Sequence, residues 1–154
     1  MSLFPAGAER GRLPLLVAHA YVRTVKWDVP GTGELVDEAT ALLSKPAPKR
    51  SAPAGAGFQA DVDALAAFVC CWRGNPAGAV EAATRALEVL PTRGGGMTRW
   101  LATRYKAGGL VFTGREREAA ALLEETVKDA RATRSPGIDA LLFAQWSDAH
   151  RRWR

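Results

Sequence analysis

The sequence has little of what a disulfide-bonded or membrane-spanning protein needs. It contains only two cysteines, the neighbours Cys70 and Cys71. Adjacent residues of a helix point about 100° apart, so these two thiols do not pair and no disulfide framework can form. The longest uncharged apolar run covers residues 64–72, far fewer than the ~20 residues that span a bilayer. We therefore expect a protein of the reducing cytoplasm with no membrane partner.

The sequence also lacks the motifs that carry catalysis or hold a metal. The glycine run at residues 94–96 is not followed by the lysine of a G-x-x-x-x-G-K-[ST] phosphate loop. H-E-x-x-H, G-x-S-x-G and C-x-x-C are absent as well. Neither His19 nor His150 has a carboxylate or a cysteine at ligand spacing. We therefore expect no enzyme, no cofactor and no metal ion.

The charge is basic but dispersed. The 154 residues carry a formal net charge of +5, with basic clusters at residues 150–154 and at Lys49-Arg50, and such clusters bind phosphate backbones. Elsewhere the arginines are interleaved with acids and no recognition-helix pattern appears, so we expect no direct nucleic-acid binding. With 47% apolar and 24% charged residues, the composition is that of a globular domain rather than a disordered tail.

A pattern of about 40 residues repeats along the chain. Trp72-Arg73-Gly74 matches Phe112-Thr113-Gly114, and each glycine is followed five residues later by an alanine. Glycine tolerates φ > 0, which lets the chain reverse sharply at the end of a helix. A looser copy begins at Trp27, where we expect residues 29–32 to form an insert before Gly33. A further copy is cut off at Trp153.

Apolar residues at three- and four-residue intervals predict helices between these corners. Asn75 followed by Pro76 is a typical helix start, and the prolines and glycines of residues 44–57 predict a flexible loop. The predicted helices cover residues 13–27, 34–43, 58–73, 76–91, 97–112, 115–133 and 137–152. They group into pairs at 13–44, 58–91 and 97–133, with a half-repeat at 137–154 and a lead at 1–12. Because one pair cannot bury its apolar face alone, we expect an all-α, right-handed solenoid of about seven helices.

Two features resemble known families. The spacing of Gly74, Ala79, Ala86 and Pro91 resembles the tetratricopeptide repeat. The Arg-, Leu- and Ala-rich style of residues 114–125 is similar to the helical-repeat region of large ATP-dependent LuxR-type transcriptional activators of the maltose-activator type.

The resemblance to the activators implies a non-catalytic effector sensor for transcription regulation. It implies a small-molecule effector or a protein partner, and self-association through the C-terminal helix. The nucleotide-binding and DNA-binding modules would lie elsewhere in a longer protein, of which this chain would be a fragment. The alternative is a tetratricopeptide-type adaptor that binds proteins and has no link to transcription.

In such a solenoid the first helix of each pair lines the inner wall. On this register the binding candidates are Asp61, Phe68, Arg104, Gly108 and Gln145. Arg104 can clamp an anion with two hydrogen bonds, and Phe68 offers an apolar face.

Four features of the sequence have a structural explanation beside the functional one. Asp61 and Asp63 are expected near a helix N-terminus, where the helix dipole favours acids. The pair Gly108-Gly109 predicts either close helix packing or close approach of a ligand. The aromatic residues at the corners predict a seam between stacked hairpins or an aromatic ligand groove, and Cys70 and Cys71 are expected to pack in the core.

Overall fold

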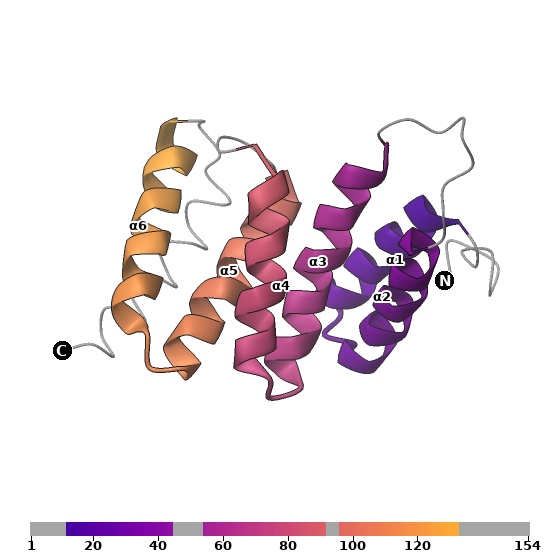
Figure 1. The fold of residues 1–154 in the computed structure, drawn as a ribbon, viewed down its shortest axis with the longest axis horizontal. Helices are drawn as coiled ribbons and strands as arrows, with labels where there is room; N and C mark the ends of the chain where they lie inside the picture. Colours follow the sequence, from indigo (N-terminus) through magenta and orange to yellow (C-terminus); the bar gives the residue numbers. More distant parts are fainter. Residues whose placement is uncertain (1–11, 45–53, 92–95, 133–154) are drawn as a thin grey trace.

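The computed structural model describes residues 12–44, 54–91 and 96–132, and these residues form helices and short turns without a strand. This confirms the all-helical expectation (Figure 1). The helices are α1 (Leu13–Val25), α2 (Val29–Leu43), α3 (Ala54–Trp72), α4 (Pro76–Val89), α5 (Gly96–Phe112) and α6 (Glu116–Ala132). The seventh helix expected at residues 137–152 lies outside the described residues.

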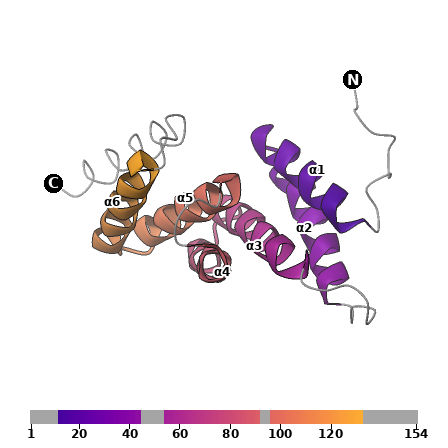
Figure 2. The same ribbon diagram turned by 90° about the horizontal axis from the view of Figure 1, so that it is seen from above.

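Each helix packs against the next one along the chain, and α3 also packs against both α1 and α5. Among the described residues, α2, α4 and α6 make no such contacts with one another. Seen from above, α1 and α5 stand on either side of α3 (Figure 2). The helix α4 lies on the side of the α3–α5 pair that faces away from α1 (Figure 2). The helices α1, α3 and α5 thus form one row, which we call the inner row.

The core runs along this row. The side chains of Leu16 on α1 and of Leu65 and Phe68 on α3 are fully buried in one apolar cluster that extends from α1 to α5. A second cluster lies between α5 and α6, around Ala119 and Leu123. The buried residues of α4 are all alanines, namely Ala79, Ala82, Ala83 and Ala86.

The two glycine corners have the same geometry. Gly74 and Gly114 both have a φ of +76°. In the first corner the Asn75 amide donates to the carbonyl of Cys70 at 2.9 Å, and in the second the Arg115 amide donates to that of Leu110 at 2.8 Å. These are the hydrogen bonds of a Schellman helix end, which needs a left-handed residue. The repeated corner predicted from the sequence is therefore confirmed for these two copies.

The first corner is built differently from the prediction. Trp27 has a φ of +58° and takes the position that glycine holds at the other corners. Its amide donates to the carbonyl of Thr24 at 3.0 Å, and the Asp28 amide donates to that of Arg23 at 3.1 Å. The predicted insert at residues 29–32 was wrong, because these residues form the first turn of α2, where Pro30 is well tolerated.

Burial supports this new alignment of the repeats. Five residues after Trp27, Gly74 and Gly114 come Thr32, Ala79 and Ala119, and all three of these are fully buried. The corner residue of the first repeat is therefore Trp27 rather than Gly33.

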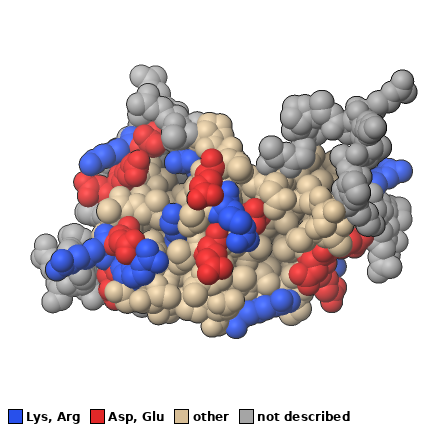
Figure 3. Space-filling model, in the orientation of Figure 1, with Lys and Arg blue, Asp and Glu red and all other residues tan. Residues whose placement is uncertain are grey.

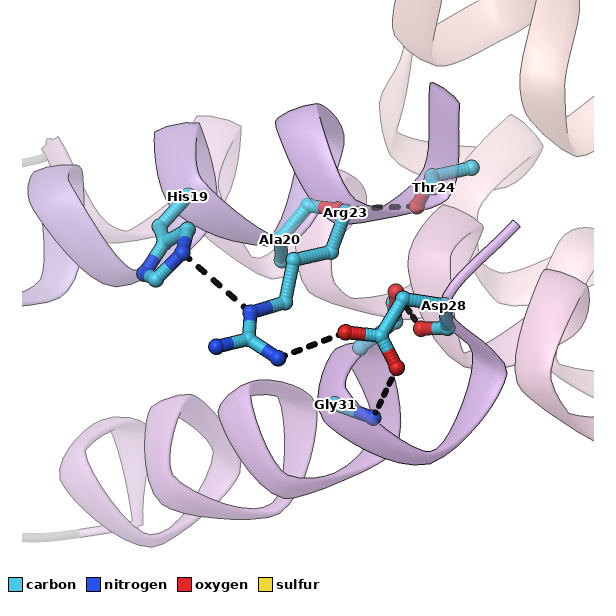
Figure 4. A network of polar contacts seen from close by, with 7 residues as sticks. His19, Ala20, Arg23, Thr24, Asp28 and Gly31 are labelled. Carbon is cyan, nitrogen blue, oxygen red and sulfur yellow. Dashed lines mark hydrogen bonds and ion pairs between the residues drawn. The ribbon is translucent and has the colours of Figure 1, made fainter. Parts of the chain in front are cut away.

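A chain of polar contacts holds the first corner (Figure 4). Asp28 accepts a hydrogen bond from the Gly31 amide at 2.9 Å and pairs with Arg23 at 2.6 Å. Arg23 in turn donates from Nε to Nε2 of His19 at 3.2 Å. The Gly31 amide and then the Arg23 guanidinium hold the pKa of Asp28 below its usual value. The carboxylate therefore caps α2 and anchors the end of α1 at the same time.

The third helix starts earlier than predicted. It begins at Ala54, so residues 54–57 belong to a helix rather than to the loop expected at 44–57. Glycine in a helix costs about 1 kcal/mol relative to alanine but does not prevent it, and the prolines of this segment end at Pro53. Asp61 and Asp63 consequently lie in the middle of α3, and the prediction that they sit at its N-terminus was wrong.

Asp63 has a packing role instead. Its carboxylate is buried and accepts hydrogen bonds from Arg85 Nε at 3.0 Å and from Gln59 Nε2 at 3.0 Å. The ion pair with Arg85 ties α3 to α4. The remaining helix boundaries agree with the predicted ones to within two residues.

Candidate functional site

A pocket of about 420 Å³ opens between α1 and α5 on the inner row. This volume lies within the usual range for small-molecule sites, roughly 300–1,000 Å³. The lining is mostly aromatic and aliphatic, with one charged side chain, that of Arg104. The lining residues are Tyr21, Val22, Thr24, Val25, Trp27, Met97, Thr98, Trp100, Leu101, Arg104 and Tyr105.

One end of the pocket is polar, and three helices contribute to it. The Tyr21 hydroxyl on α1 lies 2.9 Å from Oδ1 of Asp61 on α3 and 3.0 Å from Oγ1 of Thr98 on α5. The Thr98 hydroxyl also donates to Asp61. Burial raises the pKa of Tyr21 well above its ordinary value, so the phenol stays protonated and acts as a donor. We call Tyr21, Asp61 and Thr98 the polar triad.

Two of the aromatic residues that line the pocket, Trp27 and Tyr105, pack against aromatic rings behind the lining. Trp27 meets Trp72 edge to face, with ring centroids 5.0 Å apart. Phe68 meets Tyr105 in the same way at 5.3 Å, and the Trp72 indole donates to the Tyr105 hydroxyl at 3.3 Å. Edge-to-face pairs at these distances are attractive. Two corner aromatics, Trp27 and Trp72, thus form a seam, and Trp27 also lines the pocket.

The Arg104 guanidinium lies over two aromatic rings. Its central carbon is 5.5 Å from the ring centroid of Trp100 and 5.7 Å from that of Tyr105. Both distances are within the range of cation–π attraction. Among the described residues, no carboxylate forms an ion pair with Arg104.

Three of the five predicted site residues come together here. Arg104 lines the pocket, Asp61 anchors two lining hydroxyls, and Phe68 is fully buried beneath the aromatic rings without lining the cavity. Gly108 does not belong to the lining, because it lies beyond Arg104 along α5 and faces the Cys71 sulfur. Gln145 lies outside the described residues.

The sequence prediction missed the whole contribution of α1. It also missed Met97, Thr98 and Trp100 on α5. A usable signal was present, since Val22 and Val25 are apolar but lie on a different face of α1 from the core residues Leu16 and Ala20. A second apolar face on one helix indicates a second surface to cover.

The two adjacent glycines of α5 have different surroundings. A Cβ at Gly109 would lie 2.7 Å from the carbonyl oxygen of Pro76 and 2.8 Å from a methyl group of Val80. At Gly108 the nearest atom would be the Cys71 sulfur at 3.9 Å. The close-packing interpretation therefore holds for Gly109, where α5 crosses the start of α4.

Other kinds of site find no support in the part of the chain described here. No cluster of three or more His, Cys, Asp or Glu residues able to hold a metal occurs within it. Both cysteines are free and half-buried, and burial raises the pKa of the Cys71 thiol. Acidic and basic side chains are mixed on the face with α4 in front (Figure 3). None of the described helices is both long enough and apolar enough to cross a membrane.

No family model, no curated protein and no solved structure matches this chain.

Proposed function

We propose that this chain is a non-catalytic binding domain that takes its ligand on the inner row of helices. The observation that carries the proposal is the gathering of exposed apolar side chains at one pocket. Val25 is 77% exposed, Met97 56% and Trp27 55%, and all three line the same cavity. Apolar side chains that gather on a surface in this way mark binding sites.

We further propose that the helices form a tetratricopeptide-like, right-handed solenoid. The proposal is supported by the corners at Trp27, Gly74 and Gly114, which share one hydrogen-bond pattern. It is also supported by the packing of α3 against both α1 and α5. In such an arrangement the inner row is the concave wall available to a ligand.

The role we propose is effector sensing in a cytoplasmic transcription regulator of the LuxR type, as the sequence pattern implies. A ligand in the pocket would contact α1 and α5 together, and in the described part of the chain these two helices meet through side chains such as Tyr21 and Thr98. It would therefore stabilise one spacing of the two helices over others. Such a shift of population is how a binding domain passes a signal on.

A protein-binding adaptor is the second candidate. The observation that favours it is the position of Val25 and Trp27 at the end of α1, where exposed apolar side chains continue the pocket wall. A short helix or an extended peptide could rest its apolar face there.

The test is a thermal-shift screen of the full chain against metabolites at millimolar concentration, with a variant that blocks the pocket. Val25→Glu places a charge in the pocket at an exposed position, so the fold should tolerate it. Val89→Glu is the matched control, because Val89 is 55% exposed on α4 and does not line the pocket.

A ligand present at a hundredfold excess over its Kd stabilises the folded state by about 2.7 kcal/mol, which corresponds to a rise in Tm of roughly 5–10 °C at this chain length. We expect this rise in the wild type and in Val89→Glu, and its loss in Val25→Glu. Peptide binding lost in Val25→Glu, without any metabolite effect, would favour the adaptor. Absence of any binding that is sensitive to Val25→Glu would contradict the pocket as the site.

A further inference from the structure

We propose that the pocket binds an aromatic carboxylic acid, with the ring among the aromatic side chains and the carboxylate on Arg104. This inference rests on the proposed function and names the chemical class of the ligand. It follows from the charges at the two ends of the pocket and from the apolar surface between them.

Arg104 supplies the positive end. Among the described residues it is the one charged side chain that lines the cavity, and no carboxylate of this part of the chain pairs with it. By contrast, Arg23 and Arg85 each bind an aspartate. The central carbon of the guanidinium lies 5.5 Å from the ring centroid of Trp100, which holds the cation beside the cavity. A planar carboxylate fits the N–H edge of a guanidinium with two parallel hydrogen bonds.

The polar triad sets the orientation of the ligand. Asp61 places a negative charge behind the Tyr21 and Thr98 hydroxyls, so an anionic group is disfavoured at that end. Thr98 and Arg104 are six residues apart on α5, about 9 Å along the helix axis at 1.5 Å per residue. The Thr98 hydroxyl donates its hydrogen bond to Asp61, so its oxygen is left to act as an acceptor. A ring that carries an N–H or O–H opposite its carboxylate suits both ends.

The surface between the ends selects a ring. Trp100 and Leu101 lie between Thr98 and Arg104 on α5, and Trp27 and Met97 add to the apolar lining of the pocket. Aromatic side chains favour flat, apolar groups by stacking and edge contacts. A volume of about 420 Å³ accommodates a molecule of one or two fused rings rather than a long chain or a large oligosaccharide.

The test is isothermal titration calorimetry of the full chain with three probes. Indole-3-acetic acid has the ring, the N–H and the carboxylate. Indole-3-acetamide keeps the ring but is neutral, and sodium acetate keeps the carboxylate without a ring. We expect the acid to bind at least tenfold more tightly than the amide, and acetate to show no binding at millimolar concentration. Raising the salt should weaken binding of the acid and leave the amide unchanged.

Variants assign the effect to Arg104. Arg104→Met should reduce the affinity for the acid at least tenfold, to that of the amide, while Arg104→Lys should give an intermediate value because one point charge replaces the planar edge. Lys106→Met is the matched control, since it removes the same charge from α5 at a residue outside the lining, and it should bind as the wild type. Circular dichroism of each variant verifies the fold. If Arg104→Met does not fold, the affinity of Arg104→Lys for the acid still tests the role of the guanidinium.

Three outcomes would overturn the proposal. Equal affinity for the acid and the amide would refute the role of charge, as would unchanged acid binding in both Arg104 variants. Absence of binding by all three probes would refute the ligand class. In each case the proposed function survives if another ligand binds the wild type but not Val25→Glu, so the two proposals fail separately.

Discussion

An alanine variant is usually more stable than a glycine variant at the same position. The left-handed backbone at Trp27 should reverse this order of stability. A residue with a Cβ at φ near +58° is strained by about 1–2 kcal/mol, and glycine is not. The Trp27 ring is roughly half-buried, which corresponds to about 100 Å² of apolar surface and about 2.5 kcal/mol. Its edge contact with Trp72 adds about 1 kcal/mol.

Both Trp27→Ala and Trp27→Gly lose the ring, but only Trp27→Gly also loses the strain. We expect Trp27→Ala to lower the free energy of unfolding by about 3 kcal/mol and Trp27→Gly by about 2 kcal/mol. The assay is urea denaturation followed by far-ultraviolet circular dichroism. Lys26 provides the matched pair, since its φ is −86°. There Lys26→Gly should be less stable than Lys26→Ala by about 0.5–1 kcal/mol.

The decisive observation is the sign of the difference at the two neighbouring positions. If alanine were the more stable replacement at both residue 26 and residue 27, the corner would not be left-handed at Trp27. The alignment of Trp27 with Gly74 and Gly114 would then be refuted.

Two further pairs of variants test the packing, each by the same urea denaturation. Gly109→Ala should destabilise the folded protein by about 1–3 kcal/mol, because its Cβ would overlap Pro76 and Val80 of α4. Gly108→Ala should stabilise it by up to about 1 kcal/mol, because alanine is the better helix former. Equal effects of the two variants would contradict the close crossing of α5 and α4. Thr103 has a buried hydroxyl without a partner among the described residues, whereas the Thr32 hydroxyl donates to the Asp28 carbonyl at 2.7 Å. Thr103→Val should therefore stabilise and Thr32→Val destabilise, each by about 1 kcal/mol, and the same sign at both positions would refute this assignment.

The sequence by itself determined the helices and two of the three described corners. Helix formation depends on residues three and four apart, and Gly74, Gly114 and the Asn75 cap act within a single turn. Such signals are local, so they can be read without knowing the fold. Of the five candidates chosen on α3, α5 and beyond, Arg104 lines the pocket, while Asp61 and Phe68 lie on α3 behind residues that line it.

Only the tertiary structure decided the first corner and the pocket itself. A tryptophan gives no local sign of a left-handed backbone, since that conformation costs energy and persists only where the surroundings hold it, here through Asp28, Trp72 and Phe68. The polar triad joins Tyr21 to Thr98, which are 77 positions apart in the chain. Their meeting depends on how α1 and α5 pack around α3, and no pattern of period 3.6 within one helix specifies that packing.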